Sequence, residues 1–465
     1  MPFKKGAALL TLLFLSICFF SLYSNVGGQN GPIFITLDEA IETALVENNL
    51  VKAANLGYEK SGWDVKNAWT NLFPNLYLNT RYTWIDKQTF MERDFRQYLP
   101  PELSASIPQT VFQESYYSSL DVSMPIFNMN LYNGIRLAGK GESAAEANLK
   151  SVRRNITFQV VNTYLNVLKM NDLKNIRAEY LDLSSKNLQK AERLFEADRY
   201  SKNEVLRWKI DYQQQKSGLI ESENGYRSSV SLLNRLMNKD VNASFNYEGT
   251  IPEKLKSETN RVISLSEKEL ADLISLSDDE LVERNADLKA LYNQNEISRI
   301  TYENSYSGYM PNINFSYSYA WRENNTISFD DYSPKTVMVN FSLPIFTGFQ
   351  NITKVKSTYK EYRQSSEQLE DNKKNVRLGL IELVHKITTL KAQNELAEIN
   401  AEYSKCNYEI VENQKELGLV SNIEFIDAKL NYQNAKISKS STYYDLISAV
   451  VELYYMLGKM EFILQ

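Results

Sequence analysis

The chain contains two copies of one sequence pattern, arranged in tandem and each roughly 200 residues long. Asn48–Asn75 aligns with Asn285–Asn312, and in each segment a helical pattern stops just before its last two residues. Farther along, Met124–Phe127 (MPIF) is matched by Leu343–Phe346 (LPIF). A duplication of this kind predicts two similar structural units in series.

The duplication sets the domain boundaries that we expect. Residues 29–240 form the first repeat and residues 277–465 the second. Residues 241–276 lie between them and are expected around the middle of the helices. Tyr200–Leu206 and Val420–Ile426 are also matched, so the correspondence extends to the far part of each repeat.

The first 28 residues predict a secretory signal peptide. Lys4 and Lys5 precede an apolar run that is too short to span a bilayer as a helix, and small residues follow it up to an expected cleavage site after Gly28. Cys18 follows Ile17 where a lipoprotein signal favours a small residue, which argues against lipidation. The mature chain then has a single cysteine, so a disulfide within it is excluded.

Four segments alternate apolar and polar residues with a period of two: about 76–86, 116–124, 312–322 and 336–343. In the third, Ile313 and Phe315 alternate with Asn314 and Ser316. Strands of about ten residues cross a bilayer when tilted. The pattern favours membrane strands with an apolar outer face, and a half-buried sheet of a soluble protein is the alternative.

Long helices are predicted outside these strands. Glu142–Ser217 contains neither Gly nor Pro, and a helix from Glu142 to about Ala197 would be on the order of 80 Å long. Breaks near Asp198–Lys202 and Gly418–Asn422 predict turns between antiparallel helices. A stripe for helix packing recurs every three or four residues: Ile156, Val160, Val161, Tyr164, Leu165 and Leu168.

The composition disfavours an enzyme and a nucleic-acid-binding protein. His385 is the only histidine, so metal sites of Cys and His and histidine-based triads cannot be built. No glycine-rich phosphate loop is present. The formal net charge of −5 argues against nucleic acid as a partner. We therefore predict no catalytic residue, no cofactor and no metal.

Several of these features together resemble the TolC-like outer membrane efflux proteins, also called outer membrane factors. They are the opening LDEAIETAL at Leu37–Leu45, the helix-ending Pro74 and Pro311, the two PIF motifs and the LGLVS segment at Leu417–Ser421. The resemblance extends over nearly the whole mature chain. It implies a mainly α-helical fold with a membrane β-barrel, in which long antiparallel helices form a periplasmic α-barrel.

The resemblance also implies an assembly and its partners. Three copies of the chain would each contribute four strands to a 12-stranded barrel in the outer membrane of a Gram-negative bacterium. A periplasmic adaptor and an inner-membrane transporter would be the partners of this homotrimer. Independently, four strands cannot close a barrel, and open sheet edges are not tolerated in lipid, so subunits must share one.

Glu424 and Asp427 fall where the family carries the acidic pair of its periplasmic entrance gate. They lie three residues apart after the second turn, so one side of a helix would carry both. The counterparts in the first repeat are Glu204 and Arg207, which leaves a mixed-charge ring or a pair between subunits open. Two solvated helix carboxylates are the alternative interpretation.

The two turns are the expected docking tips for the adaptor. Their residues are Arg199, Tyr200, Ser201 and Lys202 in the first repeat and Leu417, Gly418, Leu419, Val420 and Ser421 in the second. Gly418 also fits a simple helix-ending glycine. Four prolines are expected at junctions between helices and strands: Pro74, Pro125, Pro311 and Pro344.

The favoured function is a passive exit duct for small molecules in a tripartite export system. A duct for protein secretion by a type I system has the same architecture and is not separated from it by the sequence. A periplasmic coiled-coil structural or adhesion protein would explain the helices but not four alternating strands of bilayer length.

Overall fold

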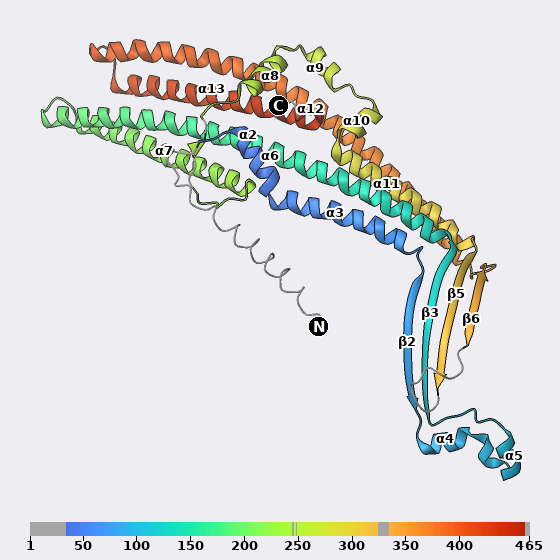
Figure 1. Cartoon of the computed structure of the whole chain (residues 1–465). Coiled ribbons are helices and arrows are strands. Elements are labelled where there is room, and N and C mark those ends of the chain that lie inside the picture. Colours follow the sequence, from blue (N-terminus) through green and yellow to red (C-terminus); the bar gives the residue numbers. More distant parts are fainter. Residues whose placement is uncertain (1–33, 244–245, 248, 324–333, 461–465) are drawn as a thin grey trace, which may run out of the picture.

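A computed structural model describes residues 34–243, 246–247, 249–323 and 334–460 (Figure 1). The predicted signal peptide and Cys18 lie outside the described residues. The molecule is elongated, with long helices that extend from one end of a small sheet. No helix in the described ranges combines the length and the apolar character needed to cross a bilayer.

Two hairpins of long helices dominate the structure. The first consists of α6 (Met129–Glu196, 68 residues) and α7 (Lys202–Leu236), and the second of α12 (Gln350–Glu416, 67 residues) and α13 (Asn422–Met456). At 1.5 Å per residue, α6 and α12 are each about 100 Å long. The prediction of long antiparallel helices is confirmed.

Helix α6 begins 13 residues earlier than the predicted start at Glu142. Gly134, Gly139 and Gly141 lie inside this first part, and each costs the helix roughly 1 kcal/mol relative to alanine. The side chain of Asn128 caps the helix by accepting a hydrogen bond from the Asn130 backbone N–H. Packing against α3 and α11 outweighs the weak propensity of the glycines.

Shorter helices run beside the long ones. Helices α2 (Leu37–Glu47) and α3 (Asn49–Thr70) pack on α6, and α11 (Ala286–Ser305) packs between α6 and α12. Helices α8 (Glu253–Ser264) and α9 (Glu267–Ile274) lie between the repeats, and α10 (Asp278–Arg284) begins the second repeat. The remaining short elements are β1 (Phe34–Ile35), which pairs in parallel with β4 (Asn246–Tyr247), then α4 (Lys87–Arg93), η1 (Phe95–Tyr98), α5 (Pro101–Ser106) and η2 (Tyr306–Tyr309).

The main sheet has the order β2-β3-β5-β6, and all of its pairs are antiparallel. Its strands are β2 (Asn75–Trp84), β3 (Glu114–Asn128), β5 (Asn312–Glu323) and β6 (Lys335–Ser342). The β3–β5 pair joins the two repeats, so one sheet is built from both. The predicted set of four strands is confirmed.

The strand register separates a polar face from an apolar face. One cross-strand row, on the polar face, consists of Tyr77, Asp121, Ser318 and Thr336. The next row, on the apolar face, consists of Leu78, Leu120, Tyr319 and Lys335. Residues directly opposite one another in an antiparallel sheet share a face. The apolar face is open in the single chain, where Leu78 is 72% and Val337 66% exposed. This is the reverse of a soluble sheet, which buries such a face.

Pro125 does not lie at a junction between strand and helix. It is inside β3, opposite Asn314 of β5, and the register shifts between Pro125 and Phe127. Proline has no N–H to donate to the ladder, and a bulge accommodates it. The strand therefore continues past its predicted end at residue 124, and the junction with α6 lies at Asn128.

The largest apolar core lies in the middle of the helices. Val160, Tyr164 and Leu168 of α6 are buried there with Ile447 and Val450 of α13. All six residues of the predicted stripe on α6 belong to this core. Both repeats contribute to it, so neither hairpin is packed independently of the other.

Candidate functional site

The ends of the two hairpins lie at the same end of the molecule, far from the sheet (Figure 1). Ser201 is the N-cap of α7 and Ser421 the N-cap of α13. Each forms a capping box with a glutamate three residues later, Glu204 and Glu424 respectively. The duplicated sequence thus produces the same local structure twice. Gly418 adopts a positive φ of 75°, which ends α12.

Glu424 has a structural role besides its predicted place at the entrance. Its Oε2 atom accepts a hydrogen bond of 2.8 Å from the Ser421 backbone N–H. This bond, with a smaller contribution from the Ser421 side chain, holds the pKa of Glu424 below its usual range. The carboxylate remains exposed to solvent. The structure therefore supplies a fixed and ionised carboxylate at the tip.

Asp427 lies on the same helix and is also exposed. Within the described part of the chain, it has no ion-pair partner. The two acidic side chains are thus available to the solvent or to another subunit. This placement is compatible with both predicted roles, an entrance gate and two solvated carboxylates.

The first-repeat counterparts behave differently from each other. Glu204 accepts a hydrogen bond of 3.0 Å from the Asn422 side chain, which belongs to the other hairpin. Tyr200 donates to the same Asn422 through its hydroxyl group, at 3.4 Å. Arg207 is exposed and forms no ion pair with Glu204 among the described residues. Glu204 therefore joins the two tips rather than pairing with Arg207.

A buried ion pair joins the two hairpins on the sheet side of the tips, and the sequence analysis did not predict it. The Lys429 ammonium group of α13 contacts the Asp211 carboxylate of α7 and donates to the Ser184 hydroxyl of α6 at 2.8 Å. Both charged side chains are almost completely buried, at 0% and 2% exposure. Burial lowers the pKa of Lys429, and the nearby Asp211 partly opposes this shift.

Aromatic residues surround this ion pair. The rings of Trp208 and Phe425 lie 6.1 Å apart, and the Lys429 ammonium group is 5.9 Å from the Trp208 ring. Trp208, Phe425 and Ala191 form a second, smaller apolar core between the hairpins. Because Asp211 and Lys429 come from different repeats, the pair fastens one hairpin to the other. The signal in the sequence was a charged residue at an inward position of each helix.

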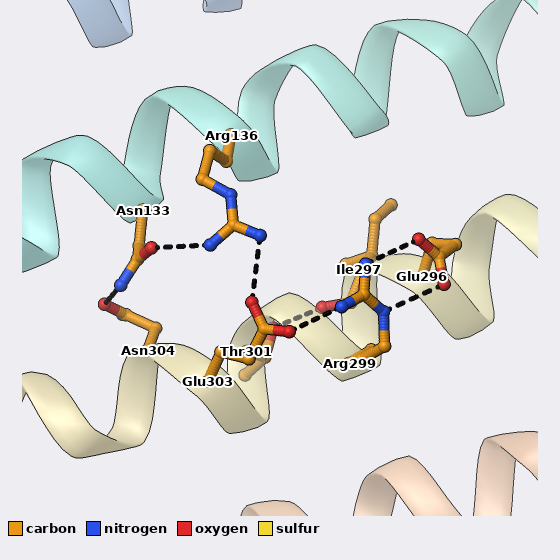
Figure 2. Close-up of polar contacts among 8 residues, drawn as sticks. All are labelled: Asn133, Arg136, Glu296, Ile297, Arg299, Thr301, Glu303 and Asn304. Atoms are coloured by element: carbon orange, nitrogen blue, oxygen red, sulfur yellow. Dashed lines mark hydrogen bonds and ion pairs between the residues drawn. The ribbon is translucent and has the colours of Figure 1, made fainter.

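At the other end of the helices, a polar network joins α6 to α11 (Figure 2). Arg136 of α6 donates to Asn133 at 3.1 Å and to Glu303 of α11 at 2.9 Å. Arg299 bridges Glu303 and Glu296, with two parallel hydrogen bonds to Glu296 of 3.0 and 2.9 Å. These bonds hold the pKa of Glu296 below its usual range. The network fixes the helices next to the sheet.

Three of the four prolines predicted for junctions lie next to strand ends. Pro74 directly precedes β2 and Pro311 directly precedes β5. Pro344 lies between β6 and α12. Pro125, inside β3, is the exception.

Residues 279–459 match the family model of outer membrane efflux proteins. This part of the chain is an outer membrane efflux protein domain. It includes β5, β6 and both helices of the second hairpin. Among curated proteins, none matches the chain in sequence.

Solved outer membrane channels share the fold over most of the chain. The CmeC channel of Campylobacter jejuni matches with a TM-score of 0.75 and 14% identity, over 91% of this chain and 86% of that one. VceC of Vibrio cholerae matches with a TM-score of 0.74 and 15% identity, over 91% and 96%. The open state of MtrE of Neisseria gonorrhoeae matches with a TM-score of 0.75 and 15% identity, over 92% and 90%. The family model over residues 279–459 and this shared fold together confirm the predicted resemblance to TolC-like outer membrane efflux proteins.

The described residues contain no cluster of three or more His, Cys, Asp or Glu side chains suited to a metal ion. His385 is an exposed residue of α12. The features that the fold brings together are instead two faces of a sheet, two tips and the contacts that hold the hairpins side by side.

Proposed function

We propose that the chain is one subunit of a homotrimeric outer membrane channel that acts as the passive exit duct of a tripartite export system. The observation that carries this proposal is the main sheet, which exposes an apolar face and has two strands, β2 and β6, at its edges. The efflux protein domain and the shared channel fold support it.

The edges of the sheet explain why several subunits must share one barrel, and the family resemblance selects three of them. Each of β2 and β6 has one partner strand among the described residues. In lipid, an unpaired backbone group costs several kcal/mol, so the edges must be closed. Pairing β2 of one subunit with β6 of the next in a ring of three gives 12 strands, an even number within the known range.

Aromatic side chains on the apolar face support its contact with lipid. Tyr82 and Tyr116 pack with ring centroids 5.0 Å apart near the end of the sheet that is farther from the helices, where Trp84 also lies. Phe315 and Phe341 lie near the end of this face that is closer to the helices. Two aromatic belts at the water interfaces are typical of membrane barrels.

The helices extend this duct into the periplasm. Their tips, at Arg199–Lys202 and Leu417–Ser421, would meet a periplasmic adaptor, which in turn would contact an inner-membrane transporter. Glu424 and Asp427 would line the entrance. Small molecules are the proposed cargo.

A matched pair of variants tests the membrane sheet. Val339→Lys places a charge on the apolar face and Asn340→Lys places the same charge on the polar face of β6. The first should cost about 2–4 kcal/mol in lipid and sharply reduce the amount of trimer in the outer membrane. The second should leave it close to the wild-type level. Fractionation followed by size analysis in detergent measures both.

Two results would contradict the proposal. One is a wild-type protein that is recovered as a soluble periplasmic monomer, which would favour the coiled-coil structural alternative. The other is equal tolerance of the two lysine substitutions, because the faces would then not differ in their surroundings.

A further inference from the structure

The polar face of the main sheet holds an anchored carboxylate, Asp121, in the middle of β3. Three side chains donate to it: Asn79 of β2 at 2.8 Å, Ser119 of β3 at 2.7 Å and Ser318 of β5 at 2.5 Å. An ionised carboxylate only accepts hydrogen bonds, and these three donors suit that form. Contacts from its own strand and from both neighbouring strands fix the position of the charge.

A guanidinium group lies on the same face, farther from the helices. Arg81 of β2 is opposite Tyr117 of β3, and Tyr77, which is opposite Asp121, is four residues away along β2. At 3.4 Å per residue, the two charged positions are about 14 Å apart along the strand. Arg81 is exposed. Opposite charges therefore occur at two different levels of one face.

We propose that, in the assembled trimer, Asp121 forms an inner ring of three carboxylates and Arg81 an outer ring of three guanidinium groups, and that these rings select permeating solutes by charge within the membrane. This inference rests on the proposed function, because the polar face becomes the lumen only if three sheets close into a barrel. It adds a second charge filter to the one proposed at the periplasmic entrance.

The expected size of the barrel makes such rings effective. Twelve strands spaced 4.8 Å apart and tilted by about 40° give a wall roughly 12 Å from the axis. Side chains project inward from this wall, so a solute on the axis passes about one Debye length from each carboxylate, since that length is about 8 Å at physiological ionic strength. The charge is thus only partly screened, and anchoring prevents it from moving away.

Thiol-modification rates test the inner ring. The test does not depend on whether the periplasmic entrance is open or closed, because the reagents reach the barrel from outside the cell. Tyr77→Cys, in a Cys406→Ser background, places a thiol beside Asp121 on the polar face. Cationic and anionic water-soluble methanethiosulfonates are applied to intact cells from outside. A carboxylate about 5 Å from the thiol, in water, should raise the reaction rate of the cationic reagent about fourfold and lower that of the anionic reagent about fourfold. Asp121→Asn should reduce the ratio of the two rates several-fold.

Two controls separate the effect of charge from folding and from the proposed function, and a third variant tests the outer ring. Ser318→Ala removes one donor but keeps the carboxylate, so it should change the ratio little. Leu78→Cys places a thiol on the apolar face and should not react. For the outer ring, Arg81→Gln should change the ratio at Thr83→Cys in the opposite direction.

Each outcome has a separate meaning. If Tyr77→Cys reacts, Leu78→Cys does not, and Asp121→Asn leaves the ratio unchanged in a trimer, the charge rings are wrong while the duct stands. If both cysteines react equally and the protein is a monomer, the duct itself is wrong.

Discussion

Gln215 of α7 and Gln433 of α13 are both buried and exchange two side-chain amide hydrogen bonds, of 3.0 and 2.7 Å. Each residue belongs to a different repeat, so the pair crosses the boundary between the two hairpins. It lies one helical turn beyond Asp211 and Lys429 on the same two helices. The contact between the repeats is therefore polar in this region, with an ion pair next to an amide pair.

We predict that Gln433→Leu destabilises the protein by about 1–3 kcal/mol, because it leaves the buried Gln215 amide without a partner. The double variant Gln215→Leu with Gln433→Leu should recover most of this loss, since neither buried amide remains. Thermal unfolding of the detergent-solubilised protein, followed by circular dichroism, measures both. A double variant that loses as much as the sum of the single variants would contradict the prediction.

The buried ion pair should be more sensitive than the amide pair. Lys429→Met leaves the Asp211 carboxylate buried without a countercharge, at a cost of about 3–5 kcal/mol. The exposed pair Lys186–Asp182 on α6 provides the control, because Lys186→Met should cost less than about 1 kcal/mol. The same unfolding measurement compares the two variants. Equal losses would show that burial does not determine the strength of these pairs.

The sequence predicted the strands well because each strand has one mainly apolar face and one mainly polar face. The period of two depends only on neighbouring residues, and the register brings most of the apolar positions of the four strands onto one face. Pro125 was the exception. Its place inside β3 depends on a bulge opposite β5, which is distant in sequence.

The contacts between the hairpins could not be predicted in this way. Asp211 and Lys429 are 218 residues apart, and nothing in either helix alone identifies its partner. The capping role of Glu424, in contrast, was visible as a serine three residues before a glutamate. The structure therefore adds a capping role to a residue that we interpret from the sequence as part of a gate or as a solvated carboxylate.

Acid should weaken the junction between the helices and the sheet through Glu296. Its hydrogen bonds from Arg299 lower its pKa in the folded protein, so the stabilisation is present above the unfolded pKa of about 4.3 and is lost as the pH falls through the lower, folded pKa. Glu296→Gln should lower the urea midpoint at pH 7 and flatten its decrease below about pH 4.3. Glu395→Gln, at an exposed position of α12, should retain the wild-type pH profile. A profile unaltered by Glu296→Gln would contradict this assignment.

The docking tips can be tested by crosslinking without disturbing the caps. Ser201 and Ser421 are N-caps, so cysteines are better placed at Lys202 and Leu419, which are exposed. In a Cys406→Ser background, both should crosslink to a periplasmic adaptor in a functional complex. Tyr403→Cys, exposed on α12 at a distance from the turn, should not. Failure at both tips in an active complex would contradict adaptor docking there.

The entrance gate requires variants that remove charge but keep the fold. Glu424→Ala would also remove half of a capping box, whereas Glu424→Gln retains a side chain that this motif accepts. Combined with Asp427→Asn, it would remove six carboxylates from a trimer and should reduce the preference of single channels for cations, as measured by the reversal potential in a KCl gradient. Glu267→Gln, on α9 between the repeats, should leave that potential unchanged. Because α13 remains capped, an unchanged potential in the double variant would mean that these two carboxylates are solvated surface groups and that the gate lies elsewhere.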